Sequence, residues 1–370
     1  MTISISNVVF ATHIFTTIFV FVFLLSLRLR SDKGFSLEVT TQLKGFSILA
    51  IVFSHIGYFL VDDQRFLFPL SIAAGVGVNI FLILSGYGLA TSSIAKQLPI
   101  LKFYKRRLPK LYVPFWISIA FFFLLDFFVL GKDYSAQYVV KSFAGLFEQA
   151  HLFSDLNSPL WYFTAIIFYY LLFPMVFSRR MPVVSALLLY LAGYFVIVMS
   201  PAFLNQVLGL YELHIVAFPL GVLFAAVAHR YNIGVFQSRI KCWLQEKRVH
   251  KNILHALHAI FMIVLVFIIG YTAYRSHVGD VPAVEQRISL ITSSALLVFF
   301  TFSKMQSKVL NWFGMYSFEI YLLHWPILSR FDMFFRFFPP WLATICYLIF
   351  FIGTGWILRT LTNRCLISAQ

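Results

Sequence analysis

Two histidines inside apolar segments are the residues of this sequence best suited to chemistry. His55 lies in the run LKGFSILAIVFSHIGY at 43–58, and His324 lies in MYSFEIYLLHWPIL at 315–328. If both runs are membrane helices, each imidazole lies near the middle of the bilayer, where an ionisable group is costly and usually faces a protein interior or a water-filled cavity. Histidine takes up and releases a proton near neutral pH. The pair predicts proton transfer at mid-membrane depth, although a single such histidine could equally be a hydrogen-bonded core residue.

A lysine shares one face of the predicted helix with His55. Lys44 precedes His55 by eleven positions, which corresponds to roughly 20° of rotation and about 16 Å of rise along an α-helix. The ammonium group of Lys44 would therefore reach water and phosphate at the membrane surface, while His55 lies near the centre. This spacing predicts an anion-binding group and a proton-transfer group in one site.

A second group of cations lies in KFYKRRLPK at 102–110, directly before the apolar run LYVPFW. Guanidinium groups bind phosphate oxygens in pairs, so Arg106, Arg107 and Lys110 are candidate phosphate ligands beside Lys44. Cytoplasmic loops are, however, enriched in lysine and arginine and attracted to anionic headgroups for reasons unrelated to substrates. Both interpretations fit the basic stretch, and its expected location on the same membrane side as Lys44 favours phosphate binding mildly.

Polar residues inside other apolar runs are candidates for supporting roles. Asn79 and Ser85 lie in GVGVNIFLILSGYGLATSS, and Ser317 and Tyr321 lie on the turns before His324. Such groups could donate hydrogen bonds to an oxyanion. In membrane helices, small and polar residues more often serve helix packing.

Candidates for contact with a sugar lie at the end of the longest predicted outer loop, 131–159. Glu148 lies within this loop, and Trp161 follows it in SPLWYF at 158–163. An aromatic face can pack on the C–H surface of a pyranose, while a carboxylate can bind its hydroxyls. Anchoring at the membrane interface is the simpler explanation for a single tryptophan. No metal site is expected, because the three cysteines have neither disulfide nor metal-ligand spacing.

Composition indicates that these residues belong to a polytopic membrane protein. The 370-residue chain is 60% hydrophobic and only 12% charged, whereas soluble domains carry about 25% charged residues. Apolar runs long enough to cross a bilayer predict an all-α membrane helix bundle with about 11 transmembrane helices. The runs cover residues 8–27, 44–61, 73–92, 111–130, 160–177, 183–200, 212–229, 252–271, 288–303, 316–330 and 341–358.

The formal net charge of +15 indicates the orientation of the chain and not a nucleic-acid partner. With the amino terminus outside, 22 of the 29 lysine and arginine residues fall in cytoplasmic segments and seven fall outside. An excess of positive charge in short loops marks the cytoplasmic side. We therefore expect the amino terminus outside and the carboxyl terminus in the cytoplasm.

Five stretches together resemble the acyltransferase type 3 family, bacterial integral membrane O-acyltransferases that use cytoplasmic acyl-CoA to modify cell-surface glycans. Lys44 and His55 resemble the family's signature of a basic residue, ten residues and a histidine. Lys44 and Lys110 stand where many relatives have arginine, and Tyr87 replaces a phenylalanine. The other similar stretches are IFLILSGYGLA at 80–90, FYKRRLPKLYVPFW at 103–116, SPLWYF at 158–163 and SFEIYLLHWP at 317–326.

The resemblance implies a ten-helix acyltransferase domain at 44–370, preceded by one transmembrane helix and a cytoplasmic linker at 1–43, in the bacterial cytoplasmic membrane. It implies acyl-CoA, with acetyl-CoA expected, as the donor substrate and no bound cofactor. The acceptor would be a hydroxyl of a cell-surface or lipid-linked glycan. His55 and His324 would be catalytic, and the phosphate ligands would be Lys44, Arg106, Arg107 and Lys110. The acceptor's identity, the acyl group, the choice between a covalent acyl-histidine and direct transfer, and the oligomeric state stay open.

Two other functions are compatible with parts of this pattern. A transporter or flippase would also have ionisable residues near the midplane and a basic cytoplasmic rim, but the sequence has no obvious inverted repeat. A non-catalytic membrane partner in exopolysaccharide assembly would not require two histidines at one depth. The sequence therefore favours an enzyme.

Overall fold

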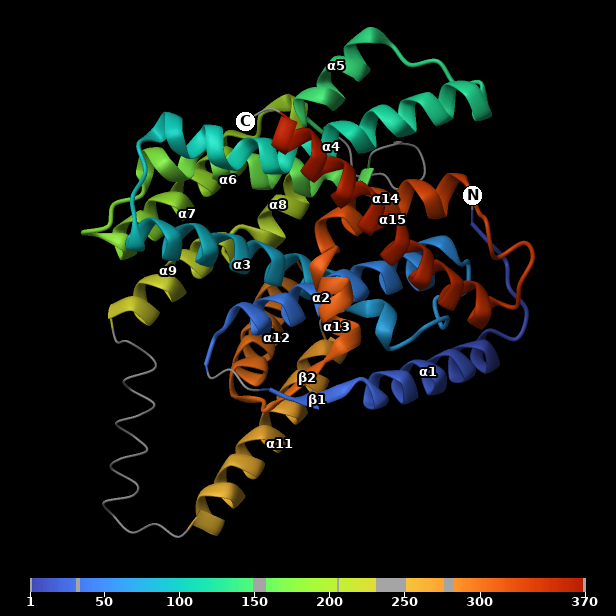
Figure 1. Ribbon diagram of the computed structural model, residues 1–370, viewed down its shortest axis with the longest axis horizontal. Helices are drawn as coiled ribbons and strands as arrows, with labels where there is room; N and C mark the ends of the chain where they lie inside the picture. Colours follow the sequence, from blue (N-terminus) through green and yellow to red (C-terminus); the bar gives the residue numbers. More distant parts are fainter. Residues whose placement is uncertain are drawn as a thin grey trace.

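The computed structural model describes residues 2–30, 34–148, 158–204, 206–230, 251–275 and 282–368. Helices form most of the described chain, and β1 (Leu27–Leu29) pairs with β2 (Met305–Ser307) in a two-stranded antiparallel ribbon (Figure 1). The helices are α1 (Val8–Leu25), α2 (Leu37–Ser54), α3 (Ala74–Ala95), α4 (Ile100–Leu130), α5 (Ala136–Ala144), α6 (Trp161–Val176), α7 (Pro182–Met199), α8 (Leu208–His214), α9 (Ala217–Arg230), α11 (Lys251–Arg275), α12 (Pro282–Phe302), α13 (Lys308–Met315), α14 (Ser317–Arg330) and α15 (Pro340–Ser368).

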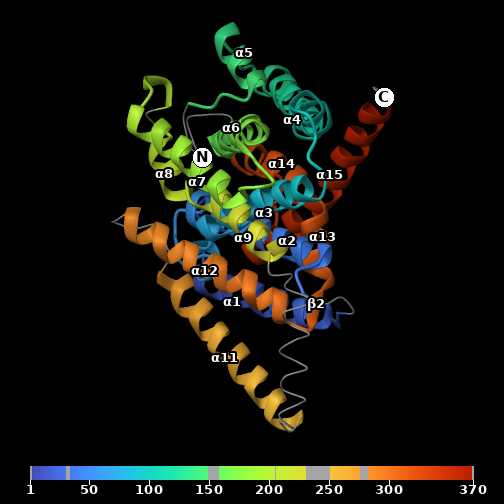
Figure 2. The same cartoon turned by 90° about the vertical axis from the view of Figure 1, so that its left-hand side faces the viewer.

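The predicted all-α membrane bundle is confirmed. Each of the eleven predicted runs overlaps helical structure, although the run 212–229 is divided between α8 and α9, and within the described ranges nine helical segments are long and apolar enough to cross a membrane. Helix α6 is apolar but shorter than these, and α14 has 14 residues. Figure 2 shows α2, α3 and α14 near the middle of the bundle, while α11 extends away from it.

Helix α2 is the most enclosed of the described spanning helices, with 78% of its most apolar window buried. It begins seven residues before the predicted start at 44, because Ser36 caps it by accepting a hydrogen bond from the Val39 amide and Glu38 complements the helix dipole. These polar first turns lie outside the apolar window on which the prediction was based. Lys44 therefore lies two turns inside the helix.

The path of α2 changes at His55. Residues His55–Leu60 form a π-helix, a rare conformation that often marks functional positions. Gly57 lies in this turn, and a Cβ atom there would come within 2.3 Å of the Phe66 carbonyl oxygen. Only glycine permits this approach, so the segment after the π-helix folds back against the helix that carries His55.

The amino-terminal helix supports the same region from another side. On α1, the rings of Phe15 and Phe19 pack edge-on against Phe53, with centroids 5.6 and 5.3 Å away. Because Phe53 precedes His55 by two residues, α1 helps to fix the turn that holds the histidine.

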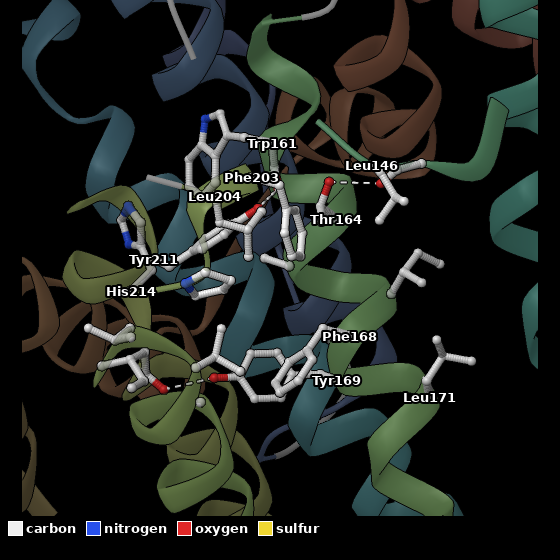
Figure 3. Close-up of a pocket in the computed structure, with 18 of the residues that line it drawn as sticks. Leu146, Trp161, Thr164, Phe168, Tyr169, Leu171, Phe203, Leu204, Tyr211 and His214 are labelled. Atoms are coloured by element: carbon white, nitrogen blue, oxygen red, sulfur yellow. Dashed lines mark hydrogen bonds between the residues drawn. The ribbon is translucent and has the colours of Figure 1, made fainter. Parts of the chain in front are cut away.

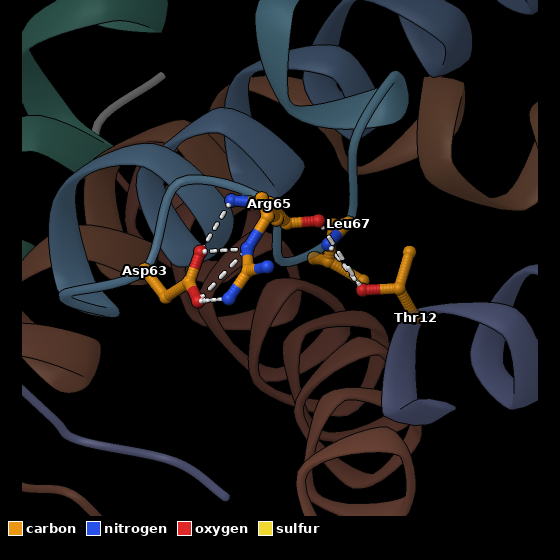
Figure 4. Close-up of polar contacts among 4 residues, drawn as sticks. All are labelled: Thr12, Asp63, Arg65 and Leu67. Carbon is orange, nitrogen blue, oxygen red and sulfur yellow. Dashed lines mark hydrogen bonds and ion pairs between the residues drawn. The ribbon is translucent and has the colours of Figure 1, made fainter. Parts of the chain in front are cut away.

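Two polar contacts secure the segment that follows the π-helix (Figure 4). The hydroxyl of Thr12 on α1 accepts a hydrogen bond of 3.0 Å from the Leu67 amide. Arg65 and Asp63 form an ion pair of 2.6 Å. The hydrogen bonds that Arg65 donates lower the pKa of the Asp63 carboxyl from 3.8 to about 2, so this pair is charged at neutral pH.

Segments predicted on the same membrane side lie together. Ile3 forms an isolated β-bridge with Val61, which ends the predicted run 44–61 on the predicted outer side. Strand β1 pairs with β2, and both lie on the predicted inner side. The basic stretch 102–110 is not a loop, because α4 already begins at Ile100. Part of the predicted linker before Lys44 likewise forms β1 and the start of α2. Residues 231–250, which hold several of the predicted cytoplasmic cations, lie outside the described residues.

Candidate active site

His55 and His324 meet in the interior of the bundle. Nδ1 of His55 lies 2.6 Å from Nε2 of His324, and the two rings are nearly parallel, with centroids 4.8 Å apart. His324 has no exposed surface and His55 has 9%. The ring of Trp325 lies 5.0 Å from that of His55. The two histidines that the sequence singled out are therefore in direct contact in the structure.

The contacts of His324 determine where the protons of this pair lie. Its Nδ1 is 3.0 Å from the carbonyl oxygen of Ile320 and 2.9 Å from that of Tyr321. Carbonyl oxygens only accept hydrogen bonds, so Nδ1 carries the proton, and the Nε2 atom of a neutral His324 ring is the acceptor. His55 must then donate from Nδ1, which leaves the lone pair of a neutral His55 on Nε2. This arrangement orients His55 as a base, as second-layer hydrogen bonds do for other functional histidines.

A cavity of about 580 Å³ lies at the Lys44 end of α2 and α14. It brings together residues from α2, α3, α4, α6, α14 and α15. Five of the residues that the sequence singled out line it: Lys44, Ser85, Lys110, Ser317 and Tyr321. The ring of Tyr321 is 6.3 Å from that of His324, so the wall of the cavity reaches to within one helical turn of the histidine pair.

Two charged residues of this cavity were missed by sequence reasoning. Glu319 on α14 is 8% exposed, and Arg359 comes from α15. The guanidinium of Arg359 donates to the Met315 carbonyl oxygen and lies over the ring of Tyr316. Glu319 could have been noticed as a carboxylate inside an apolar run. Arg359 is one of the 22 lysine and arginine residues assigned to the cytoplasmic side, and nothing in the sequence relates α15 to α2.

Arg106 and Arg107 do not line this cavity. Arg106 is exposed, and Arg107 donates a hydrogen bond of 2.9 Å from Nη2 to the Ser92 hydroxyl. Arg106 and Arg107 lie about one helical turn before Lys110 along α4, and Lys110 alone of the three predicted phosphate ligands on α4 lines the cavity.

Asn79 belongs to a different polar group. Its side chain donates to the hydroxyl of Ser289 at 2.8 Å and accepts a hydrogen bond of 2.7 Å from Nδ1 of His214. Trp161 stacks on the ring of His214, with centroids 5.7 Å apart. His214 was also missed, although a histidine in the apolar run LYELHIVAF is the available signal. Asn79 and Trp161 thus both contact His214 and belong to a group apart from the pair of His55 and His324.

Glu148, the other candidate on the predicted acceptor side, forms an ion pair of 2.6 Å with Lys141 at the surface. Both side chains are about one-third exposed, with values of 34% and 37%. Residues 149–157 of the same loop lie outside the described residues.

A buried ion pair fixes the carboxyl-terminal end of the helix that carries His324. Arg330 on α14 lies 2.5 Å from Asp126 on α4, and their side chains are 8% and 0% exposed. The hydroxyl of Tyr134 donates to the same carboxylate at 2.9 Å. Because α14 is only 14 residues long, this pair and the His55 contact determine its position in the bundle.

Comparison with known families gives one result. A family model described as an acyltransferase domain, the acyltransferase 3 model, matches residues 41–360, which is most of the chain. Comparisons with curated proteins and with solved structures find no match.

Proposed function

We propose, since this chain belongs to the acyltransferase 3 family of membrane acyltransferases, that it transfers an acetyl group from cytoplasmic acetyl-CoA to a hydroxyl of a cell-surface or lipid-linked glycan. The observation that carries the proposal is the buried contact between His55 and His324, in which the hydrogen bonds of His324 leave a basic nitrogen on His55. The proposed location is the bacterial cytoplasmic membrane.

The proposed reaction uses the free nitrogen of His55 as a general base. Nε2 takes the proton of the acceptor hydroxyl while the oxygen attacks the thioester carbonyl carbon. The tetrahedral intermediate then expels the CoA sulfur, which receives the proton from the His55 imidazolium, and the acetyl group remains on the acceptor. His324 stabilises that imidazolium through its Nε2 acceptor, much as a carboxylate does in a serine hydrolase triad.

The cavity beside Lys44 supports a binding site for the donor. Lys44, Lys110 and Arg359 are three cations that line one cavity, as binding of the CoA phosphates would require. Glu319 opposes them with one carboxylate, which keeps the cations from repelling one another when the cavity is empty. Arg106 and Arg107 remain proposed contacts outside the cavity.

Two hydroxyls of the cavity are candidates for the oxyanion. Ser85 and Ser317 both line it on the side toward Tyr321. The Tyr321 hydroxyl itself donates to the carbonyl oxygen of Pro159 at 2.5 Å, so its proton is already engaged. Asn79 is similarly engaged with His214 and Ser289. Ser85 also hydrogen-bonds with the side chains of Tyr162 and Tyr170. Ser317 is therefore the better candidate among the residues predicted for this role.

The acceptor would approach the histidine pair from the outer side. Trp161 begins α6 there, and Glu148 lies in the loop before it. The proposed role of both residues is contact with the acceptor sugar, Glu148 through its carboxylate and Trp161 through the part of its indole that neither stacks on His214 nor lines the apolar cavity described below.

The experiment that tests the proposal measures transfer of radiolabelled acetyl from acetyl-CoA by the purified full-length protein in lipid, with water or a glycan preparation as acceptor. His55→Gln should abolish transfer, because glutamine keeps approximate size but cannot take up a proton. His13→Gln is the matched control, since His13 is exposed on α1. Absence of acetyl transfer or hydrolysis by the wild-type protein, or full activity of His55→Gln, would contradict the proposal.

A further inference from the structure

A second cavity, of about 350 Å³, lies on the other side of α6 from the Lys44 cavity. Tyr162 and Ile166 of α6 face the Lys44 cavity, whereas Trp161 and Ala165 line the second one. Its walls come from α6, α7, α8 and the segment after α5 (Figure 3). Nearly all of the atoms that line it are carbon.

Five polar side chains line this cavity, and four of them, all but the indole of Trp161, are turned to partners in the protein. Their hydrogen bonds run from Thr164 to the Gly145 carbonyl at 2.8 Å, from Tyr169 to the Ile215 carbonyl at 3.2 Å, from Tyr211 to the Trp161 carbonyl at 3.4 Å, and from His214 to Asn79 at 2.7 Å. A buried water needs two to four polar partners, so a cavity in which four of the five polar side chains already donate to protein groups holds water poorly. An apolar occupant is favoured.

The mouth of the cavity is lined by large apolar side chains that are exposed. Leu146, Leu171 and Phe203 are 45%, 43% and 52% exposed, whereas Leu82 on the opposite wall is 2% or less. Figure 3 shows Leu146 and Leu171 across the cavity from His214. Of these three, Leu171 lies on the membrane helix α6, so the α6 side of the opening would face the hydrocarbon of the bilayer, while Leu146 and Phe203 lie in the segments that join the helices.

We propose that this cavity binds one acyl chain of a bilayer phospholipid. Phospholipid chains are the hydrocarbon present at the mouth, and a chain inside would regain the dispersion contacts that an empty apolar space forfeits. The chain packs beside Trp161 and the ring of His214, between α6 and α7. The site is separate from the histidine pair, and its existence does not depend on the acetyl-transfer proposal.

The test uses the fluorescence of Trp161 in full-length protein reconstituted into phosphatidylcholine brominated on its acyl chains. Subtracting the signal of Trp161→Phe isolates the contribution of Trp161. Bromine quenches tryptophan on contact, so we expect the Trp161 signal to be lost in brominated lipid and to be retained in unbrominated lipid. Acrylamide, a water-soluble quencher, should leave it unchanged.

Two variants fill the cavity from different helices, Ala165→Phe on α6 and Val196→Phe on α7. Each should restore Trp161 fluorescence in brominated lipid, because the added ring occupies the place of the chain. Leu188→Phe is the matched control on α7, where the side chain is 45% exposed and does not line the cavity, and it should leave the quenching intact.

Quenching that persists in both filling variants would show that bromine reaches Trp161 from outside the cavity and would overturn the proposal. Quenching by acrylamide would show a water-filled cavity and would also overturn it. Relief of quenching by a small mole fraction of polyprenyl phosphate would assign the cavity to a carrier lipid and not to a phospholipid.

Discussion

Nδ1 of His55 donates to Nε2 of His324 across 2.6 Å, although the two residues are 269 positions apart in the chain. The contact joins a π-helical turn at the end of α2 to the middle of α14. Both rings are held in place by packing, and the backbone carbonyls before His324 complete the chain of hydrogen bonds. The pair therefore acts as one unit, in which His324 determines which nitrogen of His55 is basic.

The first prediction concerns this dependence. His324→Leu removes the atom that accepts the hydrogen bond from Nδ1 of His55. The Nδ1–H tautomer of His55 is then no longer favoured, and its imidazolium form is no longer stabilised. We expect kcat for acetyl transfer to fall by about 10²- to 10⁴-fold, with a smaller change in the KM for acetyl-CoA. Steady-state kinetics with each substrate varied separately measure both values.

The control for His324→Leu is His324→Gln. The amide oxygen of the glutamine can still accept a hydrogen bond from Nδ1 of His55, so this variant should retain part of kcat. When His324→Leu is combined with His55→Gln, the loss of kcat should be no greater than that of His55→Gln alone, because the effects of residues that act as a unit are not additive. Additive losses would show that the two histidines act independently.

The second prediction concerns donor binding. Arg359→Ala should raise the KM for acetyl-CoA about tenfold, corresponding to about 1.5 kcal/mol for a lost charge-assisted hydrogen bond, and leave kcat nearly unchanged. Lys44→Ala should act in the same direction, because both side chains line the same cavity. Initial rates over a range of acetyl-CoA concentrations give these values.

Two other arginines provide the comparison. Arg364→Ala changes an exposed residue of α15 outside the cavity, and it should leave the KM for acetyl-CoA unchanged. Arg107→Ala tests the contact suggested by the sequence. If Arg107→Ala raises KM more than Arg359→Ala does, the CoA phosphates bind along α4 and not in the cavity.

The third prediction concerns the ion pair between α4 and α14. Asp126→Ala removes the carboxylate from a buried guanidinium, which should lower the stability of the protein by about 3 to 5 kcal/mol. Thermal unfolding in detergent or lipid measures the effect. The double variant Asp126→Leu with Arg330→Met removes both charges and should be more stable than Asp126→Ala. A double variant no more stable than the single one would show that the pair is not the source of the loss.

The fourth prediction concerns orientation. The distribution of cations predicts that Asp133, after α4, faces outside and Lys96, after α3, faces the cytoplasm. In a chain whose natural cysteines are replaced by serine, Asp133→Cys should react with a membrane-impermeant maleimide in intact cells, and Lys96→Cys should react only after lysis. The reverse pattern would invert the topology.

The sequence by itself determined the class of fold and the pair of catalytic candidates. Long apolar runs have few ways to satisfy their backbone groups in a bilayer, so composition and length were sufficient to predict the helices. His55 and His324 stood out because an ionisable group inside an apolar run is costly wherever the helix packs. Neither inference requires knowledge of which helices are neighbours.

The boundaries of the helices were less predictable from apolar runs. Helix α2 begins at Leu37 and α4 at Ile100, because a helix continues into polar residues where a cap or the following turns support it. The π-helix at His55 depends on the approach of Phe66 to Gly57, a contact that exists only after the chain has folded back.

The neighbours of each functional residue were decided only by the tertiary structure. Lys110 lines the cavity and Arg106 does not, although the two share a face of α4, because Arg106 lies one turn, about 6 Å, earlier along the helix. Arg359 joins Lys44, and Asn79 turns to His214, through packing between helices distant in sequence. The physical reason is that helical periodicity fixes which residues share a face, whereas the identity of the facing helix depends on the shapes of all the side chains between them.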